Sequence, residues 1–115
     1  KDNTIDLRRA GAKEVHMRIA CPPLAFPCNF LNFSQSRSTM ELASRKAIKQ
    51  LEGSEKNLDE YARAGSEKYL AMVEVIAGNM GIDSLIYQDM DDLVDAIGLP
   101  KTQLCTHCWD GSSYY

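Results

Sequence analysis

The stretch Glu14–Cys28 restricts the fold of this 115-residue chain more than any other. It begins with apolar residues at alternate positions, Val15, Met17 and Ile19. This period of two predicts a β-strand with one better-buried face. The strand then meets Pro22-Pro23, and because proline cannot donate a hydrogen bond to a sheet ladder, the strand must end there.

The segment before this strand indicates the fold class. Ile5 and Leu7 lie in a short helical pattern from Thr4 to Ala10, and Gly11 then favours a helix stop. A helix followed so closely by a strand predicts an α/β fold with parallel strands and flanking helices. In open α/β sheets, ligands bind beyond the carboxyl ends of the strands, so the apolar, proline-punctuated segment 21–33 is expected on the functional edge.

Three later segments carry helix signals, and one carries a strand signal. Each expected helix opens with a capping residue and closes at a glycine. The expected helices begin after Ser38, with Glu41 completing a capping box, after Ser66 and after Asp89, and they end at Gly53, at Gly78–Gly81 and at Gly98. A short strand is expected at Ser84–Tyr87, and residues 53–69 are interpreted as a charged surface insertion.

Length and charge limit the function classes. The chain is the size of one domain, 1–115, and its net charge of -3 argues against nucleic acid or an anionic membrane as the main partner. No apolar run approaches the roughly 18 to 20 residues that span a bilayer, so a cytoplasmic location is expected. The first residues resemble the middle of a helix, which suggests a piece of a longer polypeptide.

The strongest chemical signal is the C-x2-C motif Cys105–Cys108. Two thiolates at this spacing serve iron–sulfur clusters, structural zinc and dithiol redox chemistry, and they are also found as idle thiols. Further zinc ligands could come from Cys28 with Cys21, His16 or His107. We expect the strand end and the tail to meet in space. No phosphate loop and no catalytic constellation of nucleophile and base is visible.

Four segments, read in order, resemble one enzyme family. They are LRRAGAKEVHMRIACPP, the FPC that follows it, GIDSLIYQDMDDLVDAIG and CTHCWDG. Together they are similar to the C-terminal part of the glutamine phosphoribosylpyrophosphate amidotransferases, also called amidophosphoribosyltransferases. The resemblance implies part of a type I phosphoribosyltransferase fold followed by a helical C-terminal segment.

The resemblance also implies an activity for the parent enzyme. These enzymes transfer glutamine-derived ammonia to 5-phosphoribosyl 1-diphosphate, which is bound with Mg²⁺, and give 5-phosphoribosylamine for purine synthesis. The glutaminase domain and the rest of the phosphoribosyltransferase domain would be the partners of this chain, within a homo-oligomeric parent. The chain alone is expected to be inactive.

One branch of that family holds a four-iron, four-sulfur cluster. The resemblance places three of its cysteine ligands at Cys28, Cys105 and Cys108, with the fourth outside this chain. The alternative is a small cysteine-ligated metal-binding module without catalysis. Phe30–Phe33 departs from the family pattern, so no substrate contact is assigned to it.

Overall fold

The computed structural model describes residues 2–28, 30 and 42–112. Among these residues no helix combines the length and the apolar character that crossing a membrane requires. The described elements are α1 (Asp2–Arg9), β1 (His16–Ile19), α2 (Ala43–Glu52), α3 (Leu58–Ala62), α4 (Glu67–Met80), β2 (Ser84–Tyr87), α5 (Met90–Ile97), the 3-10 helix η3 (Lys101–Gln103) and α6 (His107–Asp110).

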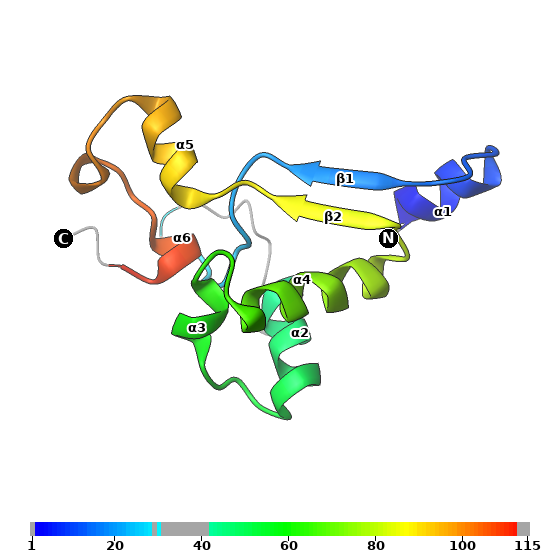
Figure 1. Ribbon diagram of the computed structural model, residues 1–115, viewed down its shortest axis with the longest axis horizontal. Coiled ribbons are helices and arrows are strands. Elements are labelled where there is room, and N and C mark those ends of the chain that lie inside the picture. Colours follow the sequence, from blue (N-terminus) through cyan, green and yellow to red (C-terminus); the bar gives the residue numbers. More distant parts are fainter. Residues whose placement is uncertain (1, 29, 31–41, 113–115) are drawn as a thin grey trace.

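The two strands lie side by side and run parallel, with α2, α3 and α4 in the crossover between them (Figure 1). Met17 is paired with Leu85 in this register. Leu85 is 7% exposed, whereas the next residue, Ile86, is 56% exposed. The pair is therefore covered on one face, where α4 packs against β2. The predicted α/β class and both predicted strands are confirmed, while the type I fold stays a prediction.

Asp83 ties α1 to the start of the sheet. Its Oδ2 accepts a hydrogen bond from the Val15 amide at 2.8 Å and another from Arg8 Nη2 at 2.9 Å. The same Arg8 nitrogen donates to the Gly81 carbonyl at 3.0 Å. The Val15 amide, followed by the Arg8 side chain, lowers the pKa of Asp83. This contact holds α1 at the amino-terminal ends of the strands, away from the edge where the cysteines lie.

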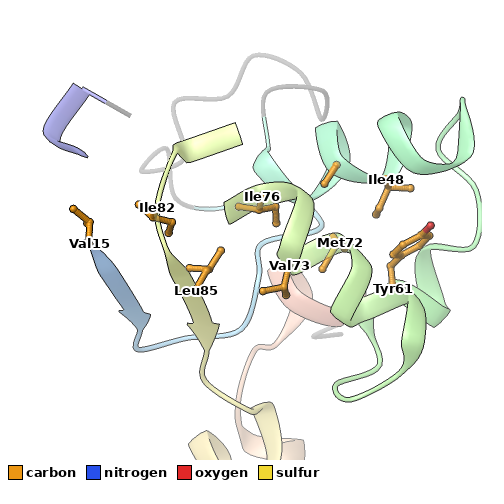
Figure 2. Packing of buried hydrophobic residues seen from close by; sticks show 9 residues of the cluster. Val15, Ile48, Tyr61, Met72, Val73, Ile76, Ile82 and Leu85 are labelled. Atoms are coloured by element: carbon orange, nitrogen blue, oxygen red, sulfur yellow. The ribbon is translucent and has the colours of Figure 1, made fainter. Parts of the chain in front are cut away.

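The core is built around α4 (Figure 2). Ile76 on α4 and Ile48 on α2 are each 1% exposed, so both side chains are almost completely buried. The cluster consists of Val15, Ala47, Ile48, Tyr61, Met72, Val73, Ile76, Ile82 and Leu85. Its members come from the strand segments and from α2, α3 and α4, which fixes the helical crossover against one face of the sheet.

Tyr61 anchors the charged segment 53–69 in this core. Most of the segment is exposed, but Tyr61 is 3% exposed and its hydroxyl donates to Glu52 Oε1 at 2.7 Å. Lys68 Nζ lies 2.7 Å from the same oxygen. Burial, and then the bond to Glu52, raise the pKa of Tyr61 to about 12. Whether residues 53–69 are an insertion relative to the family stays a prediction.

The helix-capping predictions have different outcomes. Ser66 caps α4 by accepting from the Tyr69 amide at 3.1 Å, and Asp89 caps α5 by accepting from the Asp92 amide at 3.2 Å, so both are confirmed. The capping box at 38–41 lies outside the described residues. Leu42, which the prediction placed inside that helix, instead has an extended backbone and precedes α2. Leu42 is 6% exposed, so burial of its side chain accompanies the later helix start.

Candidate cysteine site

The tail folds back on the segment that follows β1. Pro22, Pro23 and Ala25 are buried, as expected for this apolar segment. The backbone amides of Ala25 and Phe26 both donate to the Cys108 carbonyl, at 2.9 and 3.0 Å. Two hydrogen bonds to one carbonyl fix α6 against the loop beyond the carboxyl end of β1. The predicted meeting of strand end and tail is therefore confirmed.

The first turn of α2 holds the same loop from another side. Ser44 Oγ donates to the Leu24 carbonyl, and Arg45 Nε donates to the Ala25 carbonyl at 2.6 Å. The Arg45 guanidinium carbon lies 5.0 Å from the centre of the Phe26 ring. Arg45 is 7% exposed, and it also pairs with Glu55 at 3.0 Å. Sequence reasoning missed Arg45, because nothing in the α2 sequence distinguishes it from the neighbouring exposed lysines.

This arrangement places the Cys28 thiol beside the Cys108 thiol. Burial raises the pKa of Cys108 to about 11, and the charge of Cys28, a hydrogen bond with Cys28 and the charge of Cys105 contribute to the same rise. All four cysteines are described and none is in a disulfide. Dithiol redox chemistry needs a lowered pKa at the attacking thiol, so the raised pKa of Cys108 argues against Cys108 as that thiol. Cys21 lies near Tyr87 instead. The pKa of Tyr87 is raised mainly by burial, then by the charge of Tyr69 and last by the charge of Cys21.

The donor set fits an iron–sulfur cluster in chemical type. Cys28, Cys105 and Cys108 carry three soft thiol groups on two chain segments, and thiolates are the ligand chemistry that such clusters take. In the part of the chain that the structure describes, no three His, Cys, Asp or Glu side chains group closely enough to hold a metal ion. Ligands of one ion must converge on a single centre, whereas each thiolate of a cluster binds a different iron, so a cluster tolerates wider spacing.

Polar contacts of Asp110 shape the tail around the cysteines. Its Oδ2 accepts from Thr106 Oγ1 and from Lys101 Nζ, both at 2.9 Å, and its Oδ1 accepts from the Ser112 amide at 2.9 Å. Burial alone would raise the pKa of Asp110, but these bonds from Ser112, Lys101 and Thr106 lower it to about 2. His107 Nδ1 forms a hydrogen bond with the Ser112 carbonyl at 3.0 Å, and the centre of its ring lies 5.9 Å from the centre of the Phe26 ring. These contacts of His107 stabilise the tail.

His16, which the sequence offered as a possible zinc ligand, and Trp109, which follows the C-x2-C motif, each make contacts of their own. His16, at the start of β1, is exposed and contacts Ser84 Oγ at 2.7 Å and Glu14 at 3.1 Å. Trp109 lines a cavity of about 20 Å³ together with Pro22, Pro23 and residues of α2, α3 and α4. Its Nε1 is buried and lacks a hydrogen-bond partner within the described part of the chain. Trp109 therefore packs the tail onto the crossover helices.

These features define a class of protein. The chain is an α/β unit with two parallel strands, and a cysteine-bearing tail is folded onto the carboxyl end of its first strand. The family follows from similarity to known proteins. The chain is homologous to the C-terminal part of the amidophosphoribosyltransferases, which confirms the predicted resemblance.

Three relatives document this similarity, and each match covers 91% of the chain. The amidophosphoribosyltransferase of Methanothermobacter thermautotrophicus is 34% identical over 105 residues, and that of Mycobacterium tuberculosis is 34% identical over 106. The Drosophila melanogaster enzyme is 33% identical over 115 residues. The chain spans only 16 to 17% of the length of these relatives. No family model and no solved structure matches the chain.

Proposed function

We propose that this chain is part of an amidophosphoribosyltransferase. That enzyme transfers glutamine-derived ammonia to 5-phosphoribosyl 1-diphosphate, which is bound with Mg²⁺, and gives 5-phosphoribosylamine for purine synthesis. The observation that carries the proposal is similarity along 91% of the chain to enzymes of that name. The glutaminase domain and the rest of the phosphoribosyltransferase domain complete the parent, a cytoplasmic homo-oligomer, and the chain alone is inactive.

Within that parent, Cys28, Cys105 and Cys108 hold a four-iron, four-sulfur cluster, with the fourth ligand outside this chain. The support is local. The Cys108 carbonyl holds the loop that leads to Cys28, and the Cys28 thiol affects the pKa of Cys108 together with Cys105. When bound, the cluster supplies a thiolate-ligated cross-link between the tail and the strand end.

A chimaeric enzyme tests the enzymatic proposal. This chain replaces the homologous segment of the Methanothermobacter thermautotrophicus amidophosphoribosyltransferase, and glutamine-dependent formation of 5-phosphoribosylamine is measured. Retained activity supports the proposal. A chimaera that folds and assembles like the relative but forms no product contradicts it. The 115-residue chain alone, given 5-phosphoribosyl 1-diphosphate, Mg²⁺ and ammonia, is expected to form no product, and turnover would refute its inactivity.

Metal analysis tests the cluster and also the alternative, the non-catalytic metal-binding module. The chimaeric enzyme, in which the rest of the parent is present, is reconstituted anaerobically with iron and sulfide, and bound iron, acid-labile sulfide and visible absorption are measured. Cys28→Ser is expected to lose the bound iron and sulfide. Cys21→Ser is the matched control, because Cys21 lies beside Tyr87 and not beside Cys108. Equal retention in both variants contradicts the ligand set, and stoichiometric zinc without iron in the purified chain favours the module.

A further inference from the structure

We propose that Arg45 is the positioning residue of the cysteine site. From the first turn of α2 it fixes the backbone of the loop after β1, so that the Cys28 thiol faces Cys108. The inference rests on the proposed function only in its metal readout, because the placement of the two thiols can be measured without metal.

The loop is held by backbone contacts on two sides. From α2, Ser44 and Arg45 bind the carbonyls of Leu24 and Ala25. From α6, the Cys108 carbonyl binds the amides of Ala25 and of the next residue. Donors on one side and an acceptor on the other leave little freedom for this peptide segment. A residue that breaks one side therefore loosens the segment relative to the tail.

Arg45 is suited to this position because its charge is buried and contacts three groups. Its side chain is 8% exposed, and its guanidinium binds the Ala25 carbonyl, the Glu55 carboxylate and the face of Phe26. Hydrogen bonds from a charged donor are stronger than neutral ones, and removing one partner leaves the other buried and unpaired. A cation near the centre of an aromatic ring adds a directional attraction.

Phe26 connects the position of Arg45 with the positions of the two thiols. Its ring has Arg45 on one side, and the tail residues His107 and Gly111 also contact it. A Cβ at Gly111 would lie 2.8 Å from the Phe26 ring, so the tail approaches closely. The next residue is Pro27, whose ring restricts φ, and Cys28 follows. Fixing Phe26 therefore restricts the direction in which the Cys28 side chain leaves the loop.

Cross-linking in a chain with two cysteines tests the placement directly. Cys21 and Cys105 are replaced by serine, and diamide then oxidises the two remaining thiols. A Cys28–Cys108 disulfide forms with loss of two protons and two electrons, and diamide is reduced to the hydrazine. The rate follows the effective concentration of one thiol at the other. Arg45→Met is expected to slow it about tenfold, the factor that about 1.4 kcal/mol of lost orientation corresponds to, and Arg45→Lys less.

Two controls separate positioning from general destabilisation. Lys46→Met removes a charge from the neighbouring exposed position of α2 and is expected to leave the rate unchanged. Ile48→Val weakens the core through the same helix without removing a hydrogen bond to the loop, and it is also expected to leave the rate unchanged under native conditions. If Arg45→Met cross-links as fast as its parent, or if Ile48→Val slows the reaction equally, the inference is overturned.

A second variant covers the case in which Arg45→Met does not fold. Phe26→Leu keeps the Arg45 charge but removes the ring between α2 and the tail, and it is expected to slow cross-linking in the same direction. An unchanged rate would overturn the inference. Iron reconstitution of the chimaeric enzyme keeps this result apart from the proposed function. Failure of that folded chimaera to bind iron contradicts the cluster, whereas fast cross-linking in Arg45→Met contradicts only the role of Arg45.

Discussion

Replacing Asp110 with asparagine is expected to destabilise the tail at neutral pH by a predictable amount. The pKa of Asp110 is lowered from 3.8 to about 2, and its side chain is 18% exposed, so solvent screens it little. One pKa unit corresponds to about 1.4 kcal/mol, so the carboxylate contributes about 2 kcal/mol to the free energy of unfolding. The asparagine side chain would keep the shape of the aspartate but lose the charge that Lys101 and Thr106 contact.

The pH dependence provides a second measure of the same contribution. Because the pKa of Asp110 is lower in the folded state, its stabilising effect is complete above about pH 4, the unfolded value. The effect is then lost as the pH falls toward about 2. Urea unfolding followed by Trp109 fluorescence, the single tryptophan of the chain, measures the tail, and far-ultraviolet circular dichroism measures the helices. Asp110→Asn is expected to have a flatter pH profile in this range.

Asp95→Asn is the matched control, because this carboxylate on α5 is exposed. It is expected to change the free energy of unfolding by less than about 0.5 kcal/mol. The reasoning about Asp110 fails if Asp110→Asn is as mild as Asp95→Asn at neutral pH. It also fails if both variants and the unmodified chain lose stability in parallel between about pH 4 and about pH 2.

Three further substitutions test the core, the exposed face of the sheet and the tail. Ile48→Ala removes a 1% exposed side chain and is expected to cost about 2 to 5 kcal/mol in urea unfolding, whereas Ile86→Ala, at a 56% exposed position, should cost less than about 1 kcal/mol. Equal costs would contradict the burial of Ile48 in the core and the exposure of Ile86 on the sheet. Gly111→Ala places a Cβ 2.8 Å from Phe26 at a φ of 74°, so a loss of about 1 to 3 kcal/mol is expected. An unchanged Trp109 transition would show that the tail does not approach Phe26 so closely.

The sequence predicted the elements whose signals are local. The Ser66 and Asp89 caps bond to amides three residues further on, and Gly81 and Gly98 adopt left-handed conformations that end their helices. The predicted start of α2 was wrong at Leu42. The capping pattern favours a helix at this residue, but the buried Leu42 has an extended backbone and α2 begins after it. Packing between distant segments decides such positions.

The candidate site was predictable in part for the same reason. A strand that must end at prolines and a C-x2-C motif in the tail predicted that the strand end and the tail meet. Arg45 could not be predicted, because its importance depends on the Ala25 carbonyl and the Phe26 ring, which the fold brings to it. The burial of Tyr61 within the charged segment 53–69 likewise depends on packing against α4.

The parallel pairing of β1 and β2 has a consequence for the order of folding. Parallel neighbours cannot be joined by a tight turn, so His16 meets Ser84 only when α2, α3 and α4 have brought the chain back. Closing so long a loop costs entropy before any strand contact is gained. We therefore expect the helical crossover to assemble early, the sheet to form on it afterwards, and the tail to dock last, once the loop after β1 exists to receive it.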